Sequence, residues 1–501
     1  MEPTNPPTEA APRSVGRAIL RNALFVTGGG IALKAMNFLY GVFVVRQLGD
    51  DRFGNYNIIL AWVGLFSIFA ELGITQYAFR EIARDHSKAN SLFWDVLAVR
   101  ALLAVTGMIG ITAGAAAIGY APEIVLGVFV YTCSFLFSAL QASLDMVVAA
   151  HERLDYTTGT FLVGQVASML LGLFVLLTGQ GLVVFIAVGL ASMWVPILAS
   201  AWVVRRHKML VYRPQLNRSH WVGLIRGGFP FAVITLALTI AFSIDTVMLS
   251  WSVAPNQVGW YNVAYGLARS IVSFLGGFTI ALVPSLTRAF VNDTALVERW
   301  YFRSVKFISI LALPAAMGGM FVAHAVIALL YNPTTLPAAA VLQVIIWDVP
   351  LLMFTALCGN MSYVVGAERA AARIYGLNAL ANVILNFYAI PRYGIMGAAV
   401  VTVVTDLIGA VQFYLELNRH LKLPDLRPML ARVVFATLIM GAALWLAPAW
   451  HVVVLIALGG VAYVTIVLAV GVLDASEIAM LRQNAQRIVA KLQKSRRPTS
   501  P

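Results

Sequence analysis

The sequence predicts an all-α fold, a polytopic membrane bundle of about 14 transmembrane helices. Of its 501 residues, 60% are hydrophobic and only 11% are charged, whereas soluble proteins carry about 25% charged residues. Apolar runs of about 20 residues, the length that crosses a bilayer as a helix, recur along the whole chain. This composition excludes an ordinary soluble enzyme.

The predicted helices follow a short tail and are separated by short connections. The tail, residues 1–21, opens with a Pro- and Thr-rich, apolar-poor stretch that is typical of disorder. The expected spans are 22–45, 56–79, 92–118, 122–149, 159–178, 182–204, 222–251, 258–287, 305–330, 338–365, 372–390, 395–417, 429–447 and 452–473.

One design occurs twice in the chain. An apolar helix, a short break and a Gly-x-Tyr-Asn stretch that opens a second apolar helix appear with the Gly-x-Tyr-Asn at 54–57 and again at 259–262. The first helix of each copy carries one ionisable residue, Lys34 or Asp245. The repeat predicts two pseudo-symmetric six-helix lobes related by an axis normal to the membrane, with a substrate between them.

The lobes are expected at 22–213 and 214–422, followed by two extra helices within 423–473 and by a basic tail, 474–501. Asp474 and Glu477 are spaced as a capping box that opens this tail. A basic amphipathic helix lying on the membrane lipids of the anionic inner leaflet explains the pattern best, and a solvated tail helix is the alternative.

Basic residues indicate the orientation. With both termini in the cytoplasm, about 29 of the 35 Lys and Arg residues fall in cytoplasmic segments, as the positive-inside rule requires. The net charge of +13 therefore follows topology, and no nucleic-acid partner is expected. Cys133 and Cys358 lie in apolar segments and suggest no disulfide framework.

Three cations lie within predicted helices, namely Lys34, Arg100 and Arg269, and Asn37 shares a helix face with Lys34. A charge in hydrocarbon costs roughly 2.5–3.5 kcal/mol on insertion scales, so it is rarely without a role. These residues either line a wet cavity that attracts an anion or pair with acids of neighbouring helices.

Buried acids give the second group of candidates, Asp245, Glu71 and Asp348. Such carboxylates either form structural pairs with the cations or exchange a proton or sodium ion as the protein moves. Asn378, Asn382 and Asn386 follow at i, i+4 and i+8 as a polar stripe. They either bind sugar hydroxyls or, as we favour for the stripe, join helices by amide hydrogen bonds.

Several chemistries have no signature in the sequence. It contains no G-x-x-x-x-G-K-[ST] phosphate loop and no His, Cys and Glu cluster with metal-ligand spacing, so neither cofactor nor metal is expected. No predicted outside loop is large enough to build an active site. We therefore expect a protein that is not an enzyme.

Four stretches in this order resemble a known family: Val45-Arg-Gln-Leu-Gly-Asp-Asp-Arg-Phe-Gly-Asn-Tyr-Asn, Glu71-Leu-Gly-Ile-Thr-Gln, Ile244-Asp-Thr-Val-Met-Leu and Ile390-Pro-Arg-Tyr-Gly. The chain resembles, over roughly residues 20–420, the polysaccharide (O-antigen type) flippases of the multidrug/oligosaccharidyl-lipid/polysaccharide exporter superfamily.

This resemblance implies an inner-membrane flippase of bacteria that moves polyprenyl-pyrophosphate-linked oligosaccharide from the cytoplasmic to the outer leaflet, in O-antigen and other surface polysaccharide synthesis. It also implies alternating access driven by a proton or sodium gradient, with a polysaccharide polymerase and glycosyltransferases as partner proteins. Lys34, Arg100 and Arg269 would hold the pyrophosphate. The alternatives are an exporter of small amphiphiles or drugs, a lipid II flippase, which the two extra helices favour, and a membrane glycosyltransferase or polymerase.

Overall fold

The computed structural model describes residues 12–210, 214, 216–275, 286–288, 290, 293–423, 425–447, 451–474 and 477, and these form helices without a strand. The helices of the first half are α1 (Pro12–Phe66), α2 (Ile68–Glu71), α3 (Ile74–Arg84), α4 (Ala89–Ile118), α5 (Pro122–Thr132), α6 (Ser134–Ala150), α7 (Leu154–Leu177), α8 (Leu182–Ser192) and α9 (Trp194–Arg206). Those of the second half are α10 (Arg218–Ser250), α11 (Pro255–Leu275), α13 (Thr294–Leu330), α14 (Ala338–Ile345), α15 (Asp348–Val364), α16 (Glu368–Leu417), α17 (Arg427–Trp445) and α18 (Val452–Ala469).

The fold is that of a multi-pass membrane protein. Within the described ranges, nine helices are long and apolar enough to cross a bilayer, or ten if a bent pair counts as one span. Two helices, α1 and α16, each kink at a glycine with positive φ, Gly49 (72°) and Gly394 (55°). Helix α16 contains two predicted spans, whereas α1 contains one span and the beginning of the next. Each predicted span falls wholly or partly on a helix, and the total of 14 stays a prediction.

Large apolar side chains also cover the outside of the bundle. Phe174, Phe387 and Leu446 are 65%, 71% and 76% exposed. Contact of such an apolar surface with water is unfavourable in free energy, whereas contact with lipid tails is not. The exposed apolar surface is therefore the face that meets the bilayer.

The structure corrects two predicted boundaries. Residues 12–21, which the sequence assigned to the disordered tail, are the first turns of α1, and residues 1–11 lie outside the described part. The predicted single helix 56–79 is broken, because Leu72 and Gly73 both have left-handed backbone angles between α2 and α3.

Near the C-terminus, the predicted capping box is present at the first residues of the basic tail. The backbone N–H of Asp474 donates to the Glu477 carboxylate at 2.8 Å. The same carboxylate pairs with Lys306 of α13 at 2.6 Å, and the Lys306 side chain is only 7% exposed. The amphipathic helix expected after this point lies outside the described residues.

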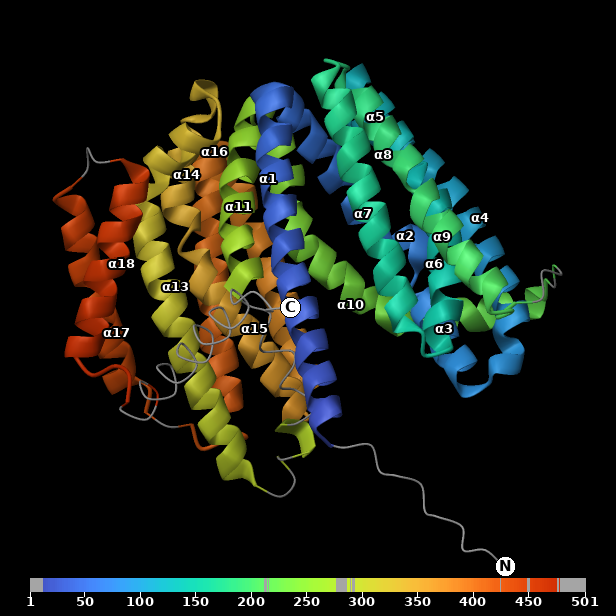
Figure 1. Cartoon of the computed structure of the whole chain (residues 1–501). Helices are drawn as coiled ribbons and strands as arrows, with labels where there is room; N and C mark the ends of the chain where they lie inside the picture. Colours follow the sequence, from blue (N-terminus) through green and yellow to red (C-terminus); the bar gives the residue numbers. More distant parts are fainter. Residues whose placement is uncertain are drawn as a thin grey trace, which may run out of the picture.

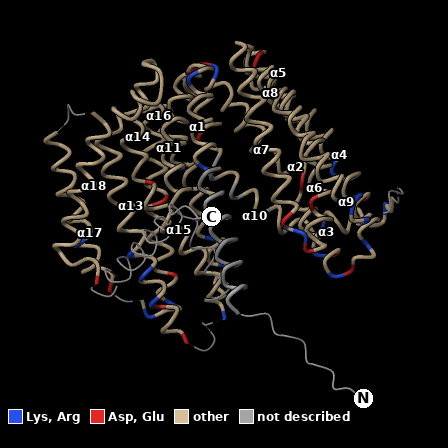
Figure 2. The backbone as a smooth tube through the Cα atoms, in the orientation of Figure 1, with Lys and Arg blue, Asp and Glu red and all other residues tan. Residues whose placement is uncertain are grey.

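Figure 1 shows the helices in two groups that meet at their upper ends and diverge below. The first group contains α3 to α9 and the second contains α11 to α18, with α1 lying along α11. Lys and Arg residues gather at the lower ends of both groups, as Figure 2 shows. A cavity between the groups can therefore differ in access at its two ends.

Helix α10 runs between the two groups (Figure 1). At its lower end the buried Asp95 carboxylate of α4 accepts the backbone N–H of Asn217 at 2.8 Å and faces His220 at 3.1 Å. At its upper end, Asp245 is bonded to α11 and α16. The two ends of one helix are thus fixed in different groups.

At the upper end of the molecule, the two Gly-x-Tyr-Asn copies cross where α1 meets α11. A Cβ placed on Gly54 would lie 1.7 Å from the Pro255 carbonyl oxygen, and one on Gly259 would lie 2.6 Å from that of Asp50. The contact is therefore reciprocal, backbone against backbone, and only glycine fits on either side. We call residues 50–54 and 255–259 the glycine crossing.

Side chains reinforce the glycine crossing. Arg46 of α1 donates to the last carbonyls of α13, those of Leu329 and Leu330, at 2.6 and 2.5 Å. A cation at a helix C-terminus also interacts favourably with the helix dipole. Asp50 accepts a hydrogen bond from Thr335 at 2.6 Å. These hydrogen bonds hold α1, α13 and the following turn together beside the crossing.

Candidate substrate cavity and buried acidic cluster

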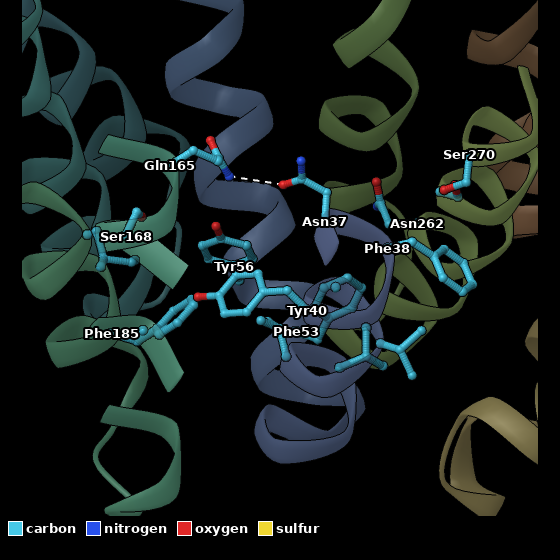
Figure 3. Close-up of a pocket in the computed structure, with 18 of the residues that line it drawn as sticks. Asn37, Phe38, Tyr40, Phe53, Tyr56, Gln165, Ser168, Phe185, Asn262 and Ser270 are labelled. Carbon is cyan, nitrogen blue, oxygen red and sulfur yellow. Dashed lines mark hydrogen bonds between the residues drawn. The ribbon is translucent and has the colours of Figure 1, made fainter. Parts of the chain in front are cut away.

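A cavity of about 780 Å³ lies between the two helix groups below the glycine crossing. Its walls come from α1, from the α5–α6 and α8 segments, from α7 and from α11 (Figure 3). Ligand cavities typically have volumes of about 300–1,000 Å³, so this one has room for a substantial ligand. Both halves of the chain contribute to it, as the repeat predicts.

Lys34 is the one charged residue among the described residues that line the cavity. Its ammonium group donates to the backbone carbonyl of Ser273 in α11. In the part of the chain that the structure describes, no carboxylate pairs with it. An ammonium group has three donors, so Lys34 has capacity left for an anionic ligand.

Carboxamides and aromatic rings line the cavity between Lys34 and the glycine crossing. The Gln165 side chain of α7 donates to Asn37 of α1 at 3.0 Å, as Figure 3 shows. The rings of Tyr56 and Phe185 meet edge to face with centroids 5.5 Å apart. Among the described residues, this wall combines apolar side chains with uncharged polar ones.

A second, apolar cavity of about 920 Å³ lies beside the first, between α11, α13, α17 and α18. Several of its lining side chains are open to the outside of the bundle, including Ile456 at 58% and Val464 at 55% exposure. The two cavities share Phe38, Leu267, Ser270 and Phe274. We call the second cavity the apolar groove; the four shared residues form a common wall between it and the first cavity.

The other predicted cations do not line the cavity. Arg100 of α4 is 3% exposed and donates to Thr75 and to Ser138, at 2.7 and 3.3 Å, so it lies behind the wall to which Ser138 contributes. Arg269 of α11 is exposed and lies over the ring of Tyr265 at 5.4 Å. The structure thus separates the three cations.

Asp245 lies in a buried polar cluster of the second group, and the ion pairs found among the described residues do not include it. One carboxylate oxygen accepts from Asn386 at 2.7 Å, and the other accepts from Tyr261 at 2.8 Å and from Thr402 at 2.9 Å. Asn386 also donates to Asn382 at 3.0 Å. The structure places this part of the asparagine stripe around a carboxylate and away from the cavity wall.

Two further acids adjoin this cluster. The carboxyl groups of Asp348 and Asp406 lie against each other and within electrostatic range of Asp245. Neither Asp348 oxygen accepts a hydrogen bond from the described donors. Glu71 lies apart from these acids, in α2, where Gln76 donates to it at 3.2 Å. Asn378, the first residue of the asparagine stripe, packs on Gly409 within α16. Asp245 and Asp348 are therefore together and Glu71 is apart.

Sequence reasoning missed several residues of these sites, and the repeat held the signal for two of them. Tyr56 and Tyr261 occupy equivalent positions in the two Gly-x-Tyr-Asn copies. Tyr56 lines the cavity, whereas Tyr261 is 1% exposed and donates to Asp245. Gln165 had no signal, because a single amide in an apolar helix does not indicate which neighbour it meets.

Residues 19–290 match the family described as polysaccharide biosynthesis protein. The chain belongs to this family. Within the match lie Lys34, the glycine crossing and Asp245. A probable flippase, AglR, of Haloferax volcanii is 23% identical over 172 residues, which cover 34% of this chain and 36% of that protein. The chain matches about a third of the length of its curated relatives.

Solved structures show that this member of the family has a known transporter fold. A lipid II flippase MurJ, in an inward closed conformation, matches with a TM-score of 0.71 at 15% identity, over 86% of this chain and 96% of that one. An inward-facing multidrug resistance MATE family transporter of the MOP superfamily matches with 0.63 at 16% identity, over 77% and 93%. At such identities the likeness is one of fold.

Proposed function

We propose that the chain is a flippase that moves polyprenyl-pyrophosphate-linked oligosaccharide from the cytoplasmic to the outer leaflet of the bacterial inner membrane. The observation that carries this proposal is the position of Lys34, a cation without a carboxylate partner among the described residues, in the wall of a cavity that shares lining residues with an apolar groove. The substrate has the same three parts in the same order. Sugars suit the cavity, pyrophosphate suits Lys34, and the prenyl chain suits the groove.

The energetics of the lipid favour this division. A pyrophosphate cannot enter hydrocarbon without a counter-charge, because burying an unpaired anion is costly. A prenyl tail that remains in an apolar groove open to the bilayer need not cross any polar surface. The flippase then moves the headgroup through the protein and leaves the tail in contact with lipid.

The positive-inside rule orients the proposed cycle. The lower ends in Figure 2 carry most of the Lys and Arg residues, so we assign them to the cytoplasm. The glycine crossing then closes the cavity on the outer side. In this orientation the structure corresponds to the state that receives substrate from inside, and release requires the crossing to separate.

The direct test uses vesicles that contain the purified protein and a labelled polyprenyl-pyrophosphate-linked oligosaccharide. Protein-dependent appearance of the label in the opposite leaflet is the expected result. Export of small cationic drugs by the same vesicles, without movement of the lipid, would instead favour the amphiphile exporter. Deletion of the gene is expected to remove surface polysaccharide and to leave the lipid-linked precursor inside, beside the glycosyltransferases that made it.

We assign ion coupling to the cluster around Asp245. Its oxygens are held by one amide and two hydroxyl groups from α11 and α16, and α10 links it to the first group of helices. Adjacent buried carboxyl groups such as Asp348 and Asp406 share a proton more readily than both ionise. Binding of a proton or a sodium ion here would change how α10 is held against α11 and α16.

Replacing Asp245 with Asn is expected to remove the response of transport to an imposed gradient. The amide lacks the charge that binds the ion. A hydrogen bond to a charged group contributes about 1.5–3 kcal/mol, so the rate of transport under the gradient should fall about 10- to 150-fold. Transport would be measured under a pH gradient and, separately, under a sodium gradient, which also identifies the ion. Asp155→Asn, whose carboxylate is 67% exposed at the start of α7, is the control. A parent protein that responds to neither gradient contradicts the assignment.

A further inference from the structure

The cavity wall between Lys34 and the glycine crossing has a composition that specifies more than lipid-linked sugar in general. Besides aliphatic side chains, its described residues carry rings, carboxamides and hydroxyl groups, and no ionisable acid or base other than tyrosine. We infer that this part, the sugar end, binds an uncharged sugar and discriminates against acidic sugars. The inference rests on the proposed function, because it takes the ligand to be a glycosylated polyprenyl pyrophosphate.

The aromatic part of the sugar end comes from both sides of the bend in α1. Tyr40 precedes the bend at Gly49 and Tyr56 follows it, and Phe185 of α8 packs against Tyr56 with a 64° angle between the rings. Tyr40 and Tyr56 are only half-buried and line the cavity, so their rings are available to a ligand. Ring faces carry negative charge density and attract C–H groups, which sugars present on their pyranose faces.

The amide part lies one helical turn from Lys34. Asn37 accepts a hydrogen bond from Gln165, and this single bond leaves further donors and acceptors on both side chains. Both residues line the cavity (Figure 3). A carboxamide pair that offers donors and acceptors side by side matches sugar hydroxyl and N-acetyl groups, which also offer both.

Charge then decides between sugar classes. Asn37 and Tyr40 follow Lys34 by three and six residues, which puts them about 4.5 and 9 Å further along the helix axis. Arg46, the next cation of α1, donates to the carbonyls of Leu329 and Leu330 and does not line the cavity. With Lys34 bound to the pyrophosphate, no second cation among the described lining residues would compensate for the lost hydration of a uronate at the sugar end. A neutral sugar needs no such counter-charge.

The experiment measures competition for the purified protein in lipid nanodiscs. The probe is a fluorescent bare polyprenyl pyrophosphate, and the competitors are polyprenyl pyrophosphates carrying an N-acetylhexosamine or a hexuronic acid. For the parent protein we expect the N-acetylhexosamine lipid to bind about tenfold more tightly than the bare lipid. The hexuronic acid lipid is expected to bind at least tenfold more weakly than the N-acetylhexosamine lipid.

Two variants locate the effect. Gln165→Leu and, independently, Asn37→Leu are expected to reduce the advantage of the N-acetylhexosamine lipid by about 5- to 10-fold, because each removes a hydrogen-bonding amide. The advantage is measured relative to binding of the bare lipid by the same variant, so that any effect on the Lys34 end of the site cancels. Gln343→Leu, at an exposed position of α14 outside the cavity lining, is the matched control.

The outcomes separate this inference from the function on which it rests. If the bare lipid binds but the hexuronic acid lipid competes as well as the N-acetylhexosamine lipid, the inference is wrong and the flippase proposal stands. The same holds if both variants keep the full sugar advantage. If the bare lipid and both glycosylated lipids fail to bind the parent protein, the proposed function fails and the inference fails with it.

Discussion

Replacing Lys34 with Gln should abolish surface polysaccharide while leaving the abundance of the protein in the membrane unchanged. Lys34 is the one charged residue among the described lining residues, and no described carboxylate depends on it. Losing hydrogen bonds between an ammonium group and a phosphate should weaken binding of polyprenyl pyrophosphate about 10- to 150-fold. Binding to the purified variant and complementation of a deletion strain would both be measured.

The controls for Lys34 separate charge from structure. Lys34→Arg retains a cation and should keep part of the activity. Lys88→Gln removes a lysine that is 51% exposed next to α4 and should have no effect. Loss of Lys34→Gln protein from the membrane, with binding intact in what remains, would assign Lys34 a structural role instead.

Adding a single methyl group at the glycine crossing is expected to stop transport. In Gly259→Ala the new Cβ would lie 2.6 Å from the Asp50 carbonyl oxygen and 3.3 Å from the Gly54 nitrogen, so the backbones must separate. The outer side of the cavity can then no longer close, and alternating access fails. We expect the rate of lipid transport to fall at least tenfold. A free-energy change of about 1.4 kcal/mol that disfavours the closed state already reduces its population relative to the open state tenfold.

Gly266→Ala is the control for this change. It lies on the same helix and lines the cavity, but its added Cβ would meet no atom within 4 Å. Both substitutions would be made in a Ser168→Cys background, where the cysteine lines the cavity, and labelling by a membrane-impermeant maleimide from outside would be compared. Stronger labelling in the Gly259 variant is the expected result. Equal labelling in the two variants would show that the glycine crossing is not the outer gate.

Helix positions could be predicted from the sequence because hydrocarbon imposes one simple requirement, about 20 apolar residues per crossing. The breaks could not. Leu72 and Gly73 interrupt an apolar run because α3 must pass the backbone of Gly228 in α10, and a Cβ on Gly73 would lie 2.3 Å from the Gly228 carbonyl oxygen. That approach depends on residues about 150 positions away, which no local pattern encodes.

The candidate site was predictable residue by residue only in part. The position of Lys34 within an apolar helix identifies it, because a charge there needs a wet surrounding or a partner. The same argument selects Arg100 and Arg269, yet Arg100 donates to hydroxyl groups behind the wall and Arg269 lies against a tyrosine ring. Spacing tells which residues share one face of a helix, and only packing tells which face meets the cavity.

The attachment of α10 to both groups restricts the motion that the protein can make. A helix of 33 residues is a strut of about 50 Å, and one end is held by Asp95 while the other holds Asp245. Two bodies joined by such a helix cannot separate freely. Because Gly227, Gly228 and Pro230 lie within it, the helix can bend there as well as turn at its ends. Widening on the inner side must therefore be accompanied by a change in the direction or bend of α10.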